Sequence, residues 1–327
     1  MNRQFIALGS MLLRCLVVVA IASVPGTTYV FAQPRLDLPP AAWQPTGARI
    51  SWKGLSFIVP PGMSGAAQND LYEMVGLGMR GRGGQCGIVL GEIPSRGDLA
   101  TYAQDLLVGN LAKLGAGIAD SQGGSNLVAD RRVGRSADGW RYVELNGMVN
   151  SSGVNRARMM LIDHGATVIS IFAVSAPGNG CVGLSLETTP NSNTITWVAL
   201  YYSLKLVGAT PSNHLREQIL GHWVGSGMSI AAGAGMLQDV VYAANGRYGG
   251  ESLTATATGK QVSSSGDGSY VVDAEKLAIF PNAGKAEAHL TRVVEDYSVM
   301  TPSKPTVQLC SVRVDVAGPY ERCLSRR

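Results

Sequence analysis

The stretch GHWVGSG, Gly221–Gly227, divides this sequence into two parts of different character. The segment before it, LREQIL, is short and helical in character, whereas the chain after it reads as β-structure to the C-terminus. Trp223 stands at the start of the first of these strands. Two interpretations are open: Trp223 lies on the first strand of a closed barrel, or it is only the first large residue of an ordinary strand.

Short β segments separated by Gly, Asn and Asp turns follow one another through this C-terminal part. They are Trp223–Ile230, Leu237–Ala244, Tyr248–Ala257, Ser269–Val272, Leu277–Phe280, Ala286–Val294, Thr306–Val314 and Tyr320–Leu324. A meander of about eight strands closes naturally into an up-and-down barrel, because closure removes the exposed edges. We therefore expect residues 216–327 to form an all-β barrel domain.

The start of this region resembles the lipocalin-like (calycin) barrels. The resemblance rests on the short helical segment, on Gly221-x-Trp223, and on the sequence VVYAANGRY that begins at Val240. It implies that Trp223 plugs one end of the barrel and that a basic residue of the last strand covers it. Arg322 and Arg313 are both candidates for that role.

An eight-stranded barrel is either filled by its own side chains or holds one small ligand. The segments SIAAGAGM and LTATATG supply small residues that leave room, unless they lie in turns or face outward. We expect an exported, non-enzymatic binding protein that holds a small apolar or amphipathic ligand; the alternative is an envelope protein–protein interaction module, an inhibitor or assembly factor, with a filled barrel. The residues expected to bind the ligand are Trp223, Tyr242, Tyr248, Phe280 and Arg322.

Residues 49–207 carry a different pattern. The segment ISWKGLSFIVPPG predicts one strand that stops at Pro60, and a helix capped by Asp98 precedes a β meander. Asp163-His164-Gly165 predicts a tight turn within this meander. A segment that begins at Thr194 is long enough for a closing helix, and its β-branched and aromatic residues leave a strand as the alternative. This order predicts an α+β domain, an antiparallel sheet with helices packed on it.

The same region resembles the PsbP-like α/β/α sandwich. The residues that carry the resemblance are GLSFIVPPG from Gly54, the mid-domain helix followed by GWRYVEL and the NRARMML and ATVISIFAV hairpin, and WVALYYSLKL from Trp197. The resemblance implies an exported or assembly-related protein, and most proteins with such domains are not enzymes. Residues 208–215 form a polar linker to the barrel, and residues 33–48 form a Pro-rich, mobile leader.

The first 32 residues indicate a secretory signal peptide. A positive beginning, the apolar run LVVVAIASV and the small residues before Ala32 predict cleavage after Ala32. The run is shorter than the roughly 20 residues of a membrane span. We therefore expect a periplasmic or secreted protein with no stable membrane span in the mature chain.

Four cysteines remain after this cleavage, and an even number in an oxidising compartment indicates disulfides. Counting outward from the turn at Ala317-Gly318-Pro319 places Cys310 opposite Cys323, where a cross-strand bond can form. Cys86 then pairs with Cys181. The alternative is four reduced, buried cysteines.

Charge and motifs exclude several classes of function. The signal carries two of the 27 basic residues and none of the 23 acidic ones, so the mature net charge is +2 and no nucleic-acid partner is expected. The cluster Arg131, Arg132 and Arg135 is interpreted as a solvated loop, with anion binding as the alternative. Asp163-His164 lacks a nucleophile elbow, and the remaining histidines lack metal-ligand spacing. We expect no catalytic residues, no metal and no cofactor.

Overall fold

The computed structural model describes residues 38–60, 62–77, 85–113, 117–118, 130–136, 138–150, 156–175, 195–208, 214–229, 234–256, 261–297, 304–315 and 318–327. Residues Pro39–Arg327 form one compact unit. The predicted signal peptide, its cleavage site after Ala32 and the first part of the leader lie outside the described residues. The division at the predicted linker stays a prediction.

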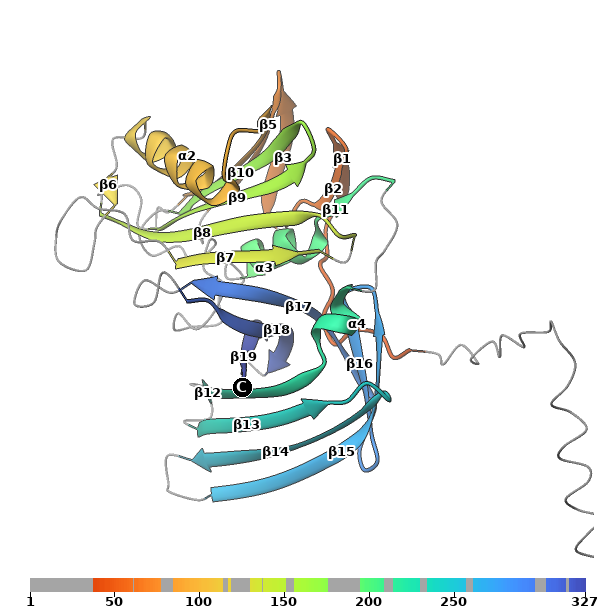
Figure 1. Ribbon diagram of the computed structural model, residues 1–327. Coiled ribbons are helices and arrows are strands. Elements are labelled where there is room, and N and C mark those ends of the chain that lie inside the picture. The colour runs from red at the N-terminus through yellow and green to blue at the C-terminus, as the bar shows by residue number, and fades with distance from the viewer. Residues whose placement is uncertain are drawn as a thin grey trace, which may run out of the picture. The chain divides into compact units, whose positions relative to one another are not determined.

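The C-terminal strands form a closed antiparallel barrel (Figure 1). Each strand pairs with the next along the chain, and β19 returns to pair with β12. The strands are β12 (Gly221–Ser229), β13 (Ala234–Tyr242), β14 (Arg247–Thr256), β15 (Gln261–Asp273), β16 (Lys276–Pro281), β17 (Glu287–Tyr297), β18 (Thr306–Asp315) and β19 (Gly318–Arg326). The predicted eight-stranded up-and-down barrel is confirmed.

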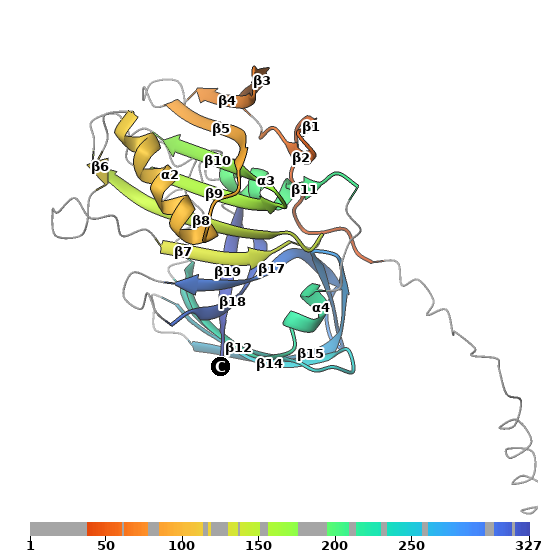
Figure 2. The same cartoon turned by 45° about the horizontal axis from the view of Figure 1, so that its top comes forward.

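A short helix, α4 (His214–Gln218), leads into the barrel. In Figure 2 it lies within the ring of strands. Leu215 of α4 and Ile219 just after it are buried in the same apolar cluster as Trp223 and Leu309. The helical segment that the sequence indicates before Gly221 therefore fills one end of the barrel.

The N-terminal strands form an antiparallel sheet in the order β7-β8-β9-β10-β5-β4-β3, with β6 beside β8. Their bounds are β3 (Met63–Gln68), β4 (Leu71–Leu77), β5 (Gln85–Pro94), β6 (Gly117–Ile118), β7 (Asp130–Arg135), β8 (Arg141–Asn150), β9 (Arg156–His164) and β10 (Thr167–Ser175). The predicted turn between β9 and β10 is confirmed: the Gly165 amide donates to the Asp163 carboxylate at 3.2 Å, and Gly165 adopts a φ of 81°.

One helix covers each face of this sheet (Figure 2). Met159 and Leu161 of β9 pack with α2 (Leu99–Lys113), whereas the alternate residues Met160 and Ile162 pack with α3 (Ile195–Ser203). Successive residues of a strand point to opposite faces, so both faces of β9 are buried. The described chain is nonetheless mostly β-structure, and none of its described helices is long and apolar enough to cross a membrane.

The predicted single strand at Ile50 is wrong, because the segment forms a hairpin. β1 (Arg49–Trp52) and β2 (Leu55–Ile58) pair antiparallel, and β11 (Lys205–Leu206) adds to β2. Lys53 and Gly54 form the turn with φ angles of 47° and 74°. Two consecutive positive φ values are the signature of the two-residue hairpin turn that matches strand twist.

β17 joins the barrel to the N-terminal sheet. Its first residues pair with β16, and Val294–Tyr297 pair with Arg131–Gly134 of β7 while β18 runs on the other side (Figure 1). The two sets of strands therefore share one continuous hydrogen-bonded sheet. Sequence reasoning did not anticipate this, since a strand's pattern does not name its neighbours.

The described end of the leader is held in place rather than mobile. Ala41 forms a parallel β-bridge to Ala288 on β17, and the Ala42 amide donates to the Ala288 carbonyl at 2.8 Å. Trp43 packs against the core that includes α3. The expectation of a mobile segment is wrong for these residues, because a tryptophan and free backbone groups meet an accepting strand.

Candidate functional site

A cavity of about 400 Å³ lies in the barrel wall and interior. One set of lining residues is apolar or aromatic: Ala42, Val240, Tyr242, Tyr248, Ile279 and Val314. The other set is polar: Gln238, Glu287, His289, Arg313 and Arg322. The volume falls within the range of small-molecule sites, and the mixed lining suits a ligand with an apolar body and a polar end.

Three of the five predicted ligand-binding residues line this cavity: Tyr242, Tyr248 and Arg322. Phe280 does not, because the lining residue on β16 is its neighbour Ile279, and adjacent strand residues face opposite ways. Trp223 is fully buried in the apolar cluster of the barrel and is also absent from the lining. Much of the two segments rich in small residues, SIAAGAGM and LTATATG, lies outside the described residues, so their contribution to the cavity stays a prediction.

Trp223 plugs the barrel end through two contacts. Its indole Nε1 donates to the Ile219 carbonyl at 2.7 Å, and the Arg326 guanidinium lies 4.6 Å from the ring centroid. Arg326 also donates to the Gln218 carbonyl. The basic residue of the last strand that covers Trp223 is thus Arg326, and neither Arg322 nor Arg313 has that role. Both of the latter lie instead at the cavity.

Three neighbouring side chains, Glu287, His289 and Arg313, form the polar side of the cavity. Arg313 Nη1 lies 3.2 Å from Glu287 Oε1 and 2.5 Å from His289 Nε2. The His289 Nδ1 lies 3.2 Å from the Val312 carbonyl oxygen, and its Nε2 lies 3.3 Å from Glu287 Oε1. Contacts with His289 and Arg313 lower the pKa of Glu287 to about 2.

Sequence reasoning missed Gln238, Glu287, His289 and Arg313, and treated His289 as an isolated histidine. A signal was present in the alternation of β17, where Glu287, His289 and Thr291 occupy every second position. An inward row of polar residues is unusual in a barrel that merely fills its own core. Burial raises the pKa of Tyr242, also in this lining, to about 12, so its phenol stays protonated and can donate a hydrogen bond.

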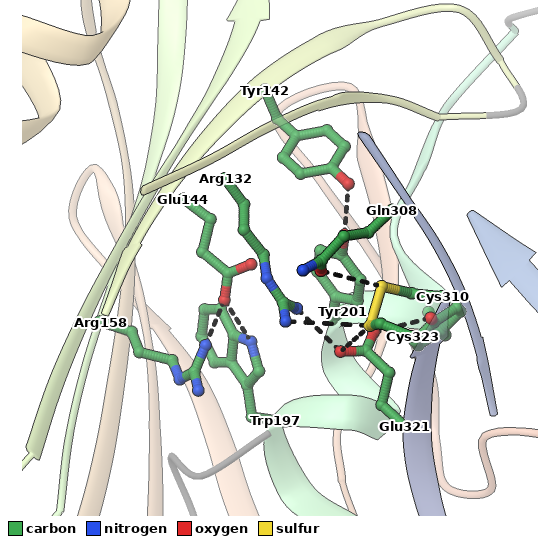
Figure 3. A network of polar contacts seen from close by, with 11 residues as sticks. Arg132, Tyr142, Glu144, Arg158, Trp197, Tyr201, Gln308, Cys310, Glu321 and Cys323 are labelled. Carbon is green, nitrogen blue, oxygen red and sulfur yellow. Dashed lines mark hydrogen bonds and ion pairs between the residues drawn. A yellow bond between two sulfur atoms is a disulfide. The ribbon is translucent and has the colours of Figure 1, made fainter. Parts of the chain in front are cut away.

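A second polar cluster lies where the N-terminal sheet meets the outer face of the barrel (Figure 3). Glu144 accepts from Arg158 at 2.5 Å and from the indole of Trp197 at 2.9 Å. Beside this group, the hydroxyls of Tyr142 and Tyr201 share a hydrogen bond. Glu144, Arg158 and Trp197 are each about 1% exposed, so these contacts are formed away from water.

The same cluster crosses to the barrel. Arg132 of β7 donates to Glu321 of β19 at 2.8 Å, and Tyr202 donates to the other oxygen of Glu321 at 2.8 Å. Arg292 of β17 lies 4.1 Å from the Tyr201 ring centroid and pairs with Glu275 at 3.0 Å. Charges of the two signs are matched here, which indicates a structural junction and not a ligand site. The predicted solvated loop at Arg131, Arg132 and Arg135 is wrong, because all three lie on β7.

The predicted disulfide between Cys310 and Cys323 is present, across directly paired positions of β18 and β19. Cys86 is also disulfide-bonded. Its predicted partner, Cys181, lies outside the described residues, so that pairing stays a prediction. Among the described residues, the one group with metal-like spacing is Cys310, Glu321 and Cys323. Its sulfurs are joined to each other and are not thiolate ligands.

Comparison with known proteins finds similarity to solved structures. No protein-family model matches the chain, and no curated protein matches it. A solved structure, the solution structure of cyanobacterial PsbP (CyanoP) from Synechocystis sp. PCC 6803, is similar with 14% sequence identity and a TM-score of 0.32. The match covers 52% of this chain and 98% of that one. At this TM-score the similarity supports no argument about function.

Proposed function

We propose that this protein is an exported, non-enzymatic binding protein whose barrel holds a small amphipathic ligand. The observation that carries the proposal is the cavity of about 400 Å³ with aromatic and aliphatic side chains on one side and charged groups on the other. A barrel that only filled itself would not place two arginines and a histidine around an open volume. This favours a ligand over the alternative of an interaction module with a filled barrel.

The end of the barrel supports a lipocalin-like assignment within this proposal. A short helix, a fully buried Trp223 and Arg326 over its ring are the arrangement that the resemblance implies. Because α4 and Trp223 close this end of the barrel, a ligand would enter the cavity at another place. We likewise propose that the N-terminal sheet, with α2 and α3 on its two faces, is an α+β domain of the PsbP-like type that docks a partner in the cell envelope.

The Cys310–Cys323 disulfide supports export, because it suits an oxidising compartment, in agreement with the signal-like N-terminus. For the cavity we propose binding and not catalysis, with no cofactor and no metal, as the sequence predicts.

Native mass spectrometry tests the proposal. The protein is secreted through its own N-terminal segment, purified without detergent, and measured in native and denatured form. A discrete extra mass that is lost on denaturation is the expected result. An apo mass, together with no binding of added amphiphiles in titration calorimetry, would overturn the proposal and turn the search to partner proteins.

A further inference from the structure

The charged side of the cavity has more positive than negative groups. Arg313 and Arg322 contribute two guanidinium ions to the lining, whereas Glu287 contributes the one carboxylate among the described lining residues. An anionic group of a ligand would meet these guanidinium groups at the polar side of the cavity.

Unused hydrogen-bonding capacity lies beside these charges. The Nε–H of Arg313 is buried and, among the described residues, has no hydrogen-bond partner. A buried donor without a partner is costly, so such a donor generally marks a place for a bound acceptor. Arg313 lines the cavity, which places this unused donor where the anionic end of a ligand would lie.

Glu287 is placed to give way to such a ligand. Its side chain is 52% exposed, while that of Arg313 is 20% exposed. The carboxylate that now pairs with Arg313 can therefore turn toward solvent, whereas the guanidinium stays at the cavity. Solvent screens the attraction between the half-exposed Glu287 and Arg313, and the carboxylate of a ligand replaces that attraction when the two exchange.

Resting on the proposed function, we propose that the ligand is a small monocarboxylate whose carboxylate replaces Glu287 as the partner of Arg313. The planar guanidinium fork matches a carboxylate with two parallel hydrogen bonds. The ligand's apolar body lies against Tyr242, Tyr248 and Ile279. Glu287 is then a specificity-determining residue: it neutralises Arg313 in the empty barrel and rejects uncharged ligands that cannot displace it.

The cavity also limits the size of this ligand. If each non-hydrogen atom takes roughly the 30 Å³ of a liquid water molecule, about 400 Å³ holds about 13 such atoms. Decanoate is a suitable probe, and decanol is its uncharged match. Decyl phosphate presents the same body with an anion of higher charge, and so separates the carboxylate from the phosphate class.

Titration calorimetry of the full mature chain with these three probes tests the proposal. We expect decanoate to bind about tenfold more tightly than decanol, a difference of roughly 1.4 kcal/mol, and more tightly than decyl phosphate. Glu287→Gln is expected to strengthen decanoate binding severalfold because it removes the competing carboxylate. Arg313→Leu is expected to reduce decanoate binding to the level of decanol.

Controls keep the outcomes distinct. Lys53→Gln removes one positive charge from an exposed site on the N-terminal hairpin and should leave all affinities unchanged. If Arg313→Leu does not fold, the change in decanoate affinity of Glu287→Gln alone decides whether the ligand carboxylate replaces Glu287. Equal binding of decanoate and decanol, or stronger binding of decyl phosphate, overturns the carboxylate assignment while the proposed function stands. Failure of all three probes to bind overturns the proposed function itself.

Discussion

Arg132 on β7 donates a 2.8 Å hydrogen bond to Glu321 on β19, although 189 residues separate them along the chain. The Glu321 side chain is 2% exposed and that of Arg132 is 19% exposed. Together with the pairing of β7 and β17, this contact joins the N-terminal sheet to the barrel. The barrel that contains the cavity is therefore attached to the N-terminal sheet through β17 and β19.

Replacement of Glu321 by glutamine should be strongly destabilising. The change keeps the shape of the side chain but leaves Arg132 buried without its counter-charge, which costs about 3–5 kcal/mol. Guanidinium denaturation of the variant measures this loss in the free energy of unfolding. Asp70→Asn is the control, because Asp70 pairs with Lys53 at 3.2 Å with its side chain 87% exposed. Its effect should stay below about 1 kcal/mol, and an equal loss in both variants would contradict the role assigned to Glu321.

Removal of the Cys310–Cys323 disulfide should lower stability, because the bond limits the freedom of the unfolded chain. The two cysteines are 13 residues apart, for which the loss is roughly 3 kcal/mol. Thermal unfolding of the double variant Cys310→Ala, Cys323→Ala measures it, and mass spectrometry of the unreduced protein confirms that this bond is gone. Unchanged stability would show that β18 and β19 are held by their pairing and packing alone.

The contact of Arg326 with Trp223 should be visible in stability and in fluorescence. Arg326→Ala removes the guanidinium from the indole face and the donor to Gln218, at a cost of about 1 kcal/mol. We expect a lower melting temperature and greater quenching of tryptophan emission by acrylamide, because Trp223 is otherwise fully buried. Arg327→Ala, one residue on and exposed, is the matched control. The same effects in both variants would refute the assignment.

Buried tyrosines should make the protein sensitive to alkaline pH. Burial raises the pKa of Tyr142 to about 12, and it raises the pKa values of Tyr201 and Tyr202 well above their usual range. Because the folded-state pKa exceeds the unfolded value near 10, the stabilisation is fully present below pH 10. It is lost as the pH rises from about 10 through 12.

Denaturation at a series of pH values, with phenolate absorbance followed in parallel, measures this dependence. The contribution of these three tyrosines to the free energy of unfolding should not change with pH just below pH 10. Above pH 10 it should fall. Tyr142→Phe should make that fall less steep. If the variant and the natural protein fall equally, Tyr142 does not contribute to the effect.

The local order of elements follows closely from the sequence, whereas the identity of the site residues follows only in part. The strands of the barrel, the cap of α2 by Asp98 at 2.9 Å from the Thr101 amide, and the Cys310–Cys323 register were all predictable, because each depends on neighbours in the sequence. The hairpin at Lys53 was missed, since a lysine rarely adopts a positive φ.

What required the tertiary structure is the set of relationships between distant segments. Sequence alone predicted the succession of strands and turns that begins at Trp223, because alternating patterns and turn residues act over a few positions. It did not determine that Arg326 covers this tryptophan, that Arg313 meets Glu287 and His289 at a cavity, or that β17 also pairs with β7. Those outcomes depend on the stagger of the strands and on packing across the fold. Arg313, Arg322 and Arg326 all lie on the last two strands. Only the three-dimensional arrangement shows which of them covers Trp223.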